Sequence, residues 1–325
     1  MAKPEIGTDC EEIGFFLVPR FSMMAFTSAV EPLRAANRLS GRSLYSWRLI
    51  STDGAAVAAS NGITVLPHAG VAEVEHCATV AVCAGIEAGA FDDRRSLAWL
   101  RRLAKRGTVI GAISTGTWVL AKAGLLQGHR CTIHWEELPS LAEAHPELDL
   151  TANLFEIDTS RFTCSGGTAA LDLMLHMIGL RHGHDLATAV SEQFIHTSLR
   201  DAHDAQRMTL RQRLRISNPK LLAAVALMES RLEESLSPDE LAKFVGLSRR
   251  QLERLFKDYL GRTPSRYYLD LRLDRARRLL THTSLSIMEV AVACGFISAA
   301  HFSRSFAARF GYPPRAVRLP RKLRG

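Results

Sequence analysis

The chain has 325 residues, of which 47% are hydrophobic, and it carries 41 Lys and Arg against 33 Asp and Glu. This apolar content excludes a disordered chain, because it is enough to build packed cores. The chain has no run of 18 apolar residues, and residues 1–9 lack the pattern of a signal peptide, so we expect a cytoplasmic protein with no membrane partner.

The basic excess is confined to one part of the chain. Residues 218–325 hold 20 Lys and Arg against 10 Asp and Glu, whereas the rest holds 21 against 23. This asymmetry predicts that a polyanion binds the C-terminal third only. The six cysteines show neither Cys-x-x-Cys pairs nor Cys/His ligand spacing, so we expect reduced thiols and no metal or other cofactor.

Residues 12–195 alternate short apolar runs with amphipathic segments. The pattern predicts strands at 13–18, 46–51, 79–83 and 108–113, and helices at 25–40, 94–105 and 116–123. Such alternation is typical of an α/β domain with a flavodoxin-like, parallel-sheet sandwich, which we assign to residues 1–195. Ligands of such domains bind at the carboxyl ends of the strands.

A strand, a sharp turn and a helix are predicted around Ser114. Ser114 stands where the strand ends, and Thr115 and Gly116 lead into the helix, so free amides there would suit an anion or a nucleophile. Gly85 follows the neighbouring strand and offers a further amide. The segment 165–168, Ser-Gly-Gly-Thr, is a second strand-to-helix turn that we expect to border the same pocket.

These segments resemble the PfpI-like branch of the class I glutamine amidotransferase-like superfamily over residues 12–195. Enzymes of that branch carry a Cys at the elbow, which is the sharp turn between this strand and this helix. They often have a His further along the chain, and an acidic residue four residues before the Pro of the first helix. Here Ser114 is the elbow residue, His134 lies 20 residues on, and Ser28 stands four residues before Pro32. The resemblance therefore implies an active site that has lost catalytic residues and is kept as a ligand pocket.

Two other interpretations of Ser114 stay open. Its side chain would also suit the N-cap of the following helix. With His134 as base, and Glu136 or Glu137 as orienting acid, it would be the nucleophile of an amidase or hydrolase.

The residues beside His134 indicate the ligand that such a pocket would hold. The indole of Trp135 and the carboxylate of Glu136 suit a cationic head group, whereas helix-start amides suit a carboxylate. A small amino acid or quaternary amine satisfies both ends, although Trp135 also fits ordinary core packing. The expected ligand site comprises Gly85, Ser114, Thr115, Gly116, His134, Trp135 and Glu136.

Residues 196–217 are polar and basic, and we interpret them as the linker between two domains. Asn218 and Pro219 restart a helix, with Pro in its first turn. From there to residue 318 the pattern is helical throughout, and a long helix at 265–281 separates two similar stretches.

Residues 236–256 and 285–306 repeat each other, with one extra residue, Ile297, in the second copy. Each copy predicts a short helix, a turn at Gly246 or Gly295, and a second helix capped by Ser248 or Ser298. That arrangement is a helix-turn-helix, whose second helix enters the major groove of DNA.

The two second helices differ in the side chains they offer to DNA. The first carries Arg and Glu, which suit guanine and cytosine edges, and the second carries small residues that fit thymine methyls. We expect the first helix to contribute more hydrogen-bonded readout, although each Arg would alternatively contact phosphate or stay solvated. The expected contacts are Ser248, Arg249, Arg250, Glu253, Arg254, Ser298, Ala299, Ala300, His301 and Arg304.

Residues 218–318 resemble the AraC/XylS family of bacterial transcription regulators. The paired motif, the start of the linking helix at residues 263–268 and the closing stretch 294–315 carry the resemblance. It implies two recognition helices in adjacent major-groove segments of double-stranded DNA. The whole chain is similar to a subgroup with this N-domain, which governs catabolism of arginine, glycine betaine or carnitine.

The sequence therefore predicts a non-enzymatic transcription regulator, an activator, whose first domain senses a small nitrogenous metabolite. We expect RNA polymerase as a partner and a homodimer, with the apolar helix 168–180 as a candidate interface. Two alternatives remain. One is a hydrolase using Ser114 fused to a DNA-binding module, and the other is a constitutive repressor or architectural protein whose first domain only dimerises.

Overall fold

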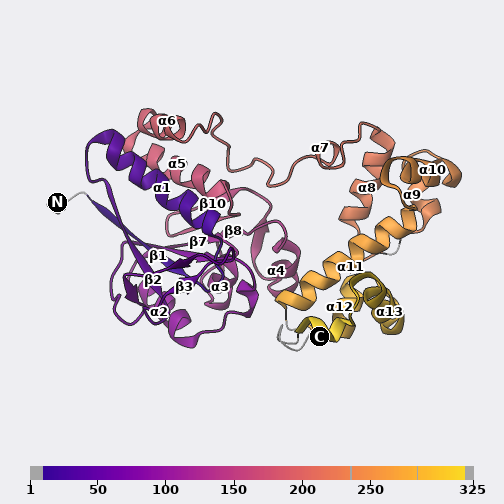
Figure 1. The fold of residues 1–325 in the computed structure, drawn as a ribbon, viewed down its shortest axis with the longest axis horizontal. Coiled ribbons are helices and arrows are strands. Elements are labelled where there is room, and N and C mark those ends of the chain that lie inside the picture. Colours follow the sequence, from indigo (N-terminus) through magenta and orange to yellow (C-terminus); the bar gives the residue numbers. More distant parts are fainter. Residues whose placement is uncertain (1–9, 235, 284, 319–325) are drawn as a thin grey trace. The chain divides into compact units, whose positions relative to one another are not determined.

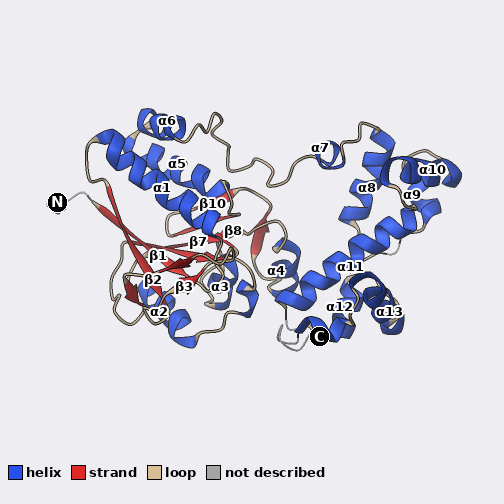
Figure 2. Ribbon diagram, in the orientation of Figure 1, coloured by secondary structure: helices blue, strands red, loops and turns tan. Residues whose placement is uncertain are grey.

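The computed structural model describes residues 10–234, 236–283 and 285–318. The chain divides into two compact units whose boundary lies between Gln206 and Arg207. Figure 2 shows strands in the first unit and helices alone in the described part of the second, which confirms the α/β plus all-α fold class. Within the described residues, no helix combines the length and apolar character needed to cross a bilayer.

The first unit alternates strands and helices along the chain (Figure 1). Its elements are β1 (Glu11–Leu17), α1 (Met23–Ser40), β2 (Tyr45–Ser51), β3 (Val57–Ala58), β4 (Thr64–Val65), β5 (Ala69–Gly70), β6 (Thr79–Ala84), the short 3-10 helix Ala88–Ala90, α2 (Arg94–Lys105), β7 (Val109–Ser114), α3 (Thr117–Lys122), β8 (Arg130–Thr132), α4 (Leu138–Ala144), β9 (Asp149–Thr151), β10 (Phe155–Ile157), β11 (Arg161–Cys164), α5 (Ala169–His182) and α6 (His184–Gln193).

The central sheet has seven strands in the order β10-β11-β7-β6-β1-β2-β5. All neighbours pair in parallel except β10 and β11, which are antiparallel. The four strands predicted from apolar runs are β1, β2, β6 and β7, and they lie side by side in the middle of this sheet. Their carboxyl ends therefore share one edge, where ligands of parallel sheets bind.

Both faces of the sheet are buried, which explains the continuous apolar runs of its strands. Along β1, Phe15 and Leu17 pack into a core with α1, α5 and α6, whereas Phe16 packs into a second core with α2 and α3. This alternation follows from the two-residue period of a strand. The result is a three-layer sandwich.

The second unit is helical where it is described (Figure 1). Its elements are α7 (Leu210–Leu214), α8 (Pro219–Ser230), α9 (Pro238–Phe244), α10 (Arg249–Leu260), α11 (Pro264–His282), α12 (Ile287–Ala293), α13 (Ala299–Phe310) and the 3-10 helix Pro314–Arg318. The two predicted helix-turn-helix motifs are α9 with α10, and α12 with α13.

Local signals set the helix boundaries of both motifs. The Ser248 side chain accepts from the Gln251 amide at 3.3 Å, and Ser298 accepts from the His301 amide at 3.4 Å, so both predicted caps are present. Gly246 and Gly295 have φ of 63° and 69°, a left-handed conformation that favours glycine. Each motif has its own core, one around Leu252 and the other around Phe302.

The predicted linker, residues 196–217, is divided between the two units. Residues 196–206 belong to the first unit, and the Leu154 amide donates to the Ala202 carbonyl at 2.8 Å. In the second half, Ile216 is buried in the core of the first motif, and Arg213 pairs with Glu229 on α8 at 2.8 Å. The 196–206 segment thus ends where the first unit ends.

Candidate functional site

Ser114 lies at the carboxyl end of β7 in a strained turn. Its φ is 63°, which is unusual for a non-glycine residue, and it is 5% exposed. The N-cap of α3 is Gly116, with no side-chain cap bond. The interpretation of Ser114 as a helix N-cap is therefore wrong, because α3 begins after Gly116 and no side chain accepts from its first amides.

The turn is closely packed by the residues expected beside it. Gly166 touches Ser114, since a Cβ added to Gly166 would lie 2.5 Å from Ser114 Cβ. The Thr115 hydroxyl donates to the Gly85 carbonyl at 2.6 Å, and the Gly116 amide donates to the Ile113 carbonyl at 3.2 Å. The fold therefore gathers these glycines at the elbow, but the Gly116 amide is already used and is not free for a ligand.

His134, Trp135 and Glu136 lie together between β8 and α4. The His134 and Trp135 ring centroids are 5.6 Å apart, and the Glu136 amide donates to His134 Nδ1 at 3.4 Å. Burial lowers the pKa of His134 and outweighs Glu136 and Glu137, which raise it. Glu136 is exposed, and Trp135 is half-buried rather than part of a core. A neutral imidazole, an indole and a carboxylate are thus available at one place.

The contacts of a working hydrolase are not found here. Within the described part of the chain, the Ser114 hydroxyl forms no hydrogen bond with His134 or with any other residue. Buried Glu137 accepts from Trp118 Nε1 at 3.1 Å, a contact that ties α4 to α3. A nucleophilic serine needs a base within hydrogen-bond reach. The arrangement suits binding rather than catalysis.

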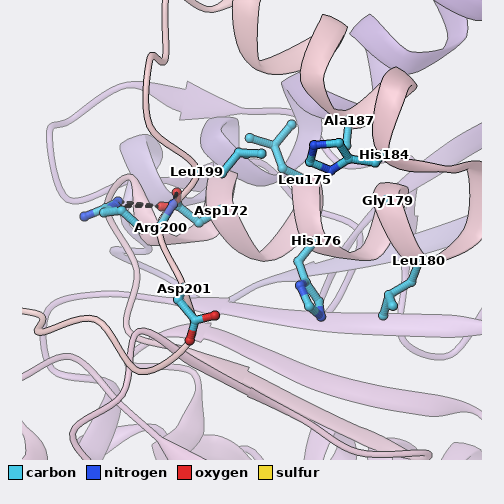
Figure 3. A pocket seen from close by; sticks show the side chains of 10 residues that line it. All are labelled: Asp172, Leu175, His176, Gly179, Leu180, His184, Ala187, Leu199, Arg200 and Asp201. Atoms are coloured by element: carbon cyan, nitrogen blue, oxygen red, sulfur yellow. Dashed lines mark hydrogen bonds and ion pairs between the residues drawn. The ribbon is translucent and has the colours of Figure 1, made fainter.

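A buried carboxylate holds the 196–206 segment on the first unit. Asp172 on α5 has a fully buried side chain, and it accepts from Arg200 Nη2 at 2.6 Å, Arg200 Nε at 3.0 Å and the Arg200 amide at 3.1 Å. His196 Nε2 lies 2.9 Å from the same carboxylate. Figure 3 shows Arg200 and Asp172 facing each other beside a pocket of about 310 Å³ between α5, α6 and the segment.

Gln206, the last residue of the first unit, reaches the strand that precedes His134. Its side-chain amide donates to Thr132 Oγ1 at 3.1 Å and to the Ile133 carbonyl at 3.0 Å. It also donates to the Asn153 carbonyl at 2.8 Å. The Thr132 carbonyl in turn accepts from the Thr117 hydroxyl on α3 at 2.8 Å. A continuous set of hydrogen bonds therefore runs from α3, the helix that follows Ser114, to Gln206 at the end of the first unit.

Asp172, Arg200 and Gln206 were not among the functional residues predicted from the sequence. One signal was present, because Asp172 is an acid within the apolar helix α5, where a charge is buried only when it is paired. Its partner, 28 residues away, carries no such signal. The Gln206 side chain has no feature in the sequence that distinguishes it from the other polar side chains of the predicted linker.

The exposed face of α10 includes Arg250 and Arg254, two cations for which the described residues supply no acidic partner. Arg249, Arg250 and Arg254 are exposed, but Arg249 pairs with Glu253 at 2.9 Å and with Asp239 at 3.5 Å. Arg250 and Arg254 form no ion pair with any residue that the structure describes. These two guanidinium groups are therefore available to an anionic or hydrogen-bonding partner.

The corresponding face of α13 is smaller and less charged. Ala300, His301 and Arg304 are exposed, whereas Ala299 is half-buried. The His301 ring lies 5.7 Å from Phe296, which holds the imidazole against the turn. Which of the ten expected residues touch DNA remains a prediction, but the two helices do present unequal surfaces.

Family models match both units. The DJ-1/PfpI family matches residues 13–179, and a helix-turn-helix domain matches residues 241–319. A solved structure described as an AraC family transcriptional regulator from Pseudomonas putida is 29% identical, with a TM-score of 0.52. That match covers 57% of this chain and 99% of the other.

Curated relatives match nearly the whole chain. The HTH-type transcriptional regulator GbdR of Pseudomonas aeruginosa is 49% identical over 313 residues, which cover 96% of this chain and 85% of GbdR. Over part of the chain, the HTH-type transcriptional activator RhaS of Enterobacter sp. is 37% identical, covering 36% of this chain and 42% of RhaS. These relatives are named as regulators and not as enzymes, so they do not favour a hydrolase.

Proposed function

The chain belongs to the AraC-type helix-turn-helix transcriptional regulators that carry an N-terminal DJ-1/PfpI domain, and from this we propose that it is a ligand-controlled activator. Two recognition helices read DNA, and a small amino acid or quaternary amine binds the first unit. The observation that carries the proposal is the pair of unpartnered cations, Arg250 and Arg254, on a capped helix of a helix-turn-helix.

The DNA contact is tested by removing one of these cations. Arg254→Ala is expected to weaken binding to the specific operator by about 1–3 kcal/mol, with a smaller loss on random DNA, if the guanidinium contacts a base. Arg95→Ala, an exposed cation on α2, removes the same charge from the first unit and serves as the control. Equal affinities of Arg254→Ala and wild type for both DNAs would refute base contact.

The ligand assignment is supported by the group of His134, Trp135 and Glu136. A neutral imidazole can accept or donate, the indole face attracts a quaternary ammonium, and the exposed carboxylate supplies the counter-charge. The ligand's own carboxylate requires donors from the elbow other than the Gly116 amide, which is already used.

A thermal-shift screen with arginine, glycine betaine and carnitine tests this assignment. One of them at about 100 times its Kd is expected to stabilise the first unit by ~2.7 kcal/mol, a rise of several degrees in Tm. Trp135→Ala should abolish the rise, and Trp135→Phe, which keeps an aromatic face, should retain it. No shift with these or with a wider panel of amines and amino acids would support a first unit that only dimerises.

The contacts of Gln206 support a route from ligand to DNA-binding unit. A ligand that displaces the His134 loop also displaces the Ile133 carbonyl, to which Gln206 donates at the boundary of the units. Ligand binding shifts such an equilibrium only by its differential affinity for the two states. Gln206→Leu is therefore expected to keep ligand binding and to lose the effect of ligand on DNA affinity.

The activator role and the partners belong to the same proposal. The relative RhaS is named as an activator, which supports activation through RNA polymerase. Transcription in vitro from a selected operator is expected to rise when protein and ligand are added, and a fall would indicate repression. Sedimentation of the full chain is expected to show a homodimer, and a monomer at micromolar concentration would contradict it.

A further inference from the structure

One carboxylate on the linking helix α11 binds both helix-turn-helix motifs. Asp270 is 6% exposed, and its Oδ2 accepts from Arg262 Nη1 at 2.8 Å. Its Oδ1 lies 2.6 Å from Arg309 Nη1. Arg266, one turn earlier on α11, lies 3.4 Å from the same oxygen.

The two arginines come from equivalent ends of the two recognition helices. Arg262 follows Gly261, the C-cap of α10, and Arg309 is the penultimate residue of α13. Arg309 also donates to Asp274 at 2.7 Å, so its guanidinium spans two carboxylates of α11. Asp270 therefore joins the carboxyl ends of α10 and α13.

This bridge matters because the motifs share no core. One core includes Leu252 and Phe256, the other includes Phe302 and Phe306, and α11 contributes to both. Separate cores leave the relative orientation of the recognition helices to α11, to polar contacts that cross it, and to the turn at Gly295, where an added Cβ would lie 2.5 Å from the Glu233 carbonyl oxygen. A buried ion pair can add little to stability and, in some proteins, serves to fix one geometry.

We propose that Asp270 is a positioning residue that sets the spacing between the two DNA segments read by α10 and α13. This positioning role rests on the proposed function, in which both helices enter the major groove. Adjacent base pairs are separated by about 3.4 Å along the duplex axis, so a small change in the angle between the helices changes the preferred spacing by a base pair. With Asp270 in place, one spacing fits, and without it several spacings fit.

The experiment is selection of binding sites from random DNA by the full chain. Wild type is expected to select two sequence boxes at one spacing. We expect two variants, Asp270→Asn and Arg262→Gln, to select the same boxes at several spacings. The Arg262 side chain is half-exposed, so its substitution disturbs the fold less. Asp258→Asn is the matched control, because it removes the charge of an exposed carboxylate on α10 and leaves Asp270 and Arg309 unchanged, and it should keep the single spacing.

Duplexes made from the selected boxes give the quantitative test. Inserting one base pair between the boxes is expected to weaken wild-type binding about tenfold or more, and to weaken Arg262→Gln by less than about threefold. A variant that keeps the wild-type spacing and the full penalty overturns the role of Asp270. If Asp270→Asn fails to fold, the Arg262→Gln result decides by itself. Selection of a single box by wild type would overturn both the two-helix readout and this inference.

Discussion

Asp172→Asn is the sharpest test of how the 196–206 segment is held on the first unit. The substitution keeps the size of the side chain and one acceptor oxygen, but removes the charge and one acceptor. Asp172 has no exposed side-chain surface, and it accepts three bonds from Arg200. The change therefore acts on one buried carboxylate, which holds Arg200 and also lies 2.9 Å from His196 Nε2 in the same segment.

The magnitude follows from these bonds. A hydrogen bond to a charged group contributes about 1.5–3 kcal/mol and a neutral one about 1 kcal/mol. Because the Arg200 side chain is 32% exposed, water replaces part of what is lost. We expect the docked segment to lose ~2 kcal/mol relative to its open form. At 1.4 kcal/mol for each factor of ten, opening becomes about 30 times more frequent.

Hydrogen exchange of the Arg200 amide measures this opening, since that amide donates to Asp172. Its exchange rate is expected to rise about 30-fold in Asp172→Asn. Asp201→Asn changes an exposed carboxylate of the same pocket and should leave the rate unchanged. A change of less than about threefold in Asp172→Asn would show that other contacts hold the segment, and would refute the anchor.

Three further outcomes follow. DNA affinity is expected to fall steeply with salt, because Lys and Arg neutralise phosphates, and a flat response in a binding titration would contradict DNA recognition. Burial lowers the pKa of His134 in the folded protein, so the unfolded chain binds more protons once the pH falls through about 6.5, and the folded state loses stability there. We therefore expect Tm, measured from about pH 7.5 to 5.5, to fall less in His134→Gln than in wild type. Ser114→Ala is expected to bind the operator as wild type does and to show no difference from wild type in hydrolysis of amide substrates. A hydrolysis activity that wild type has and Ser114→Ala lacks would restore the hydrolase interpretation.

The parts of the molecule that depend on nearby residues were predictable. The helix-turn-helix boundaries depend on Ser caps and Gly turns within a few residues, and the repeat displays them twice. The central strands depend on apolar runs that a sheet buried on both faces requires. The elbow at Ser114 follows from one strand-to-helix junction, and the structure places Ser114 in the strained conformation typical of such a turn.

The sequence by itself therefore determined both folds, the family and the unequal charge of the two recognition helices. Only the tertiary structure decided which distant groups bond. Asp172 meets Arg200 across 28 residues, Gln206 meets Ile133 across 73, and Asp270 joins Arg262 to Arg309. The physical reason is that a side-chain bond depends on where loops and helix ends lie in space, and residue type and spacing do not encode that position once the partners are far apart in the chain.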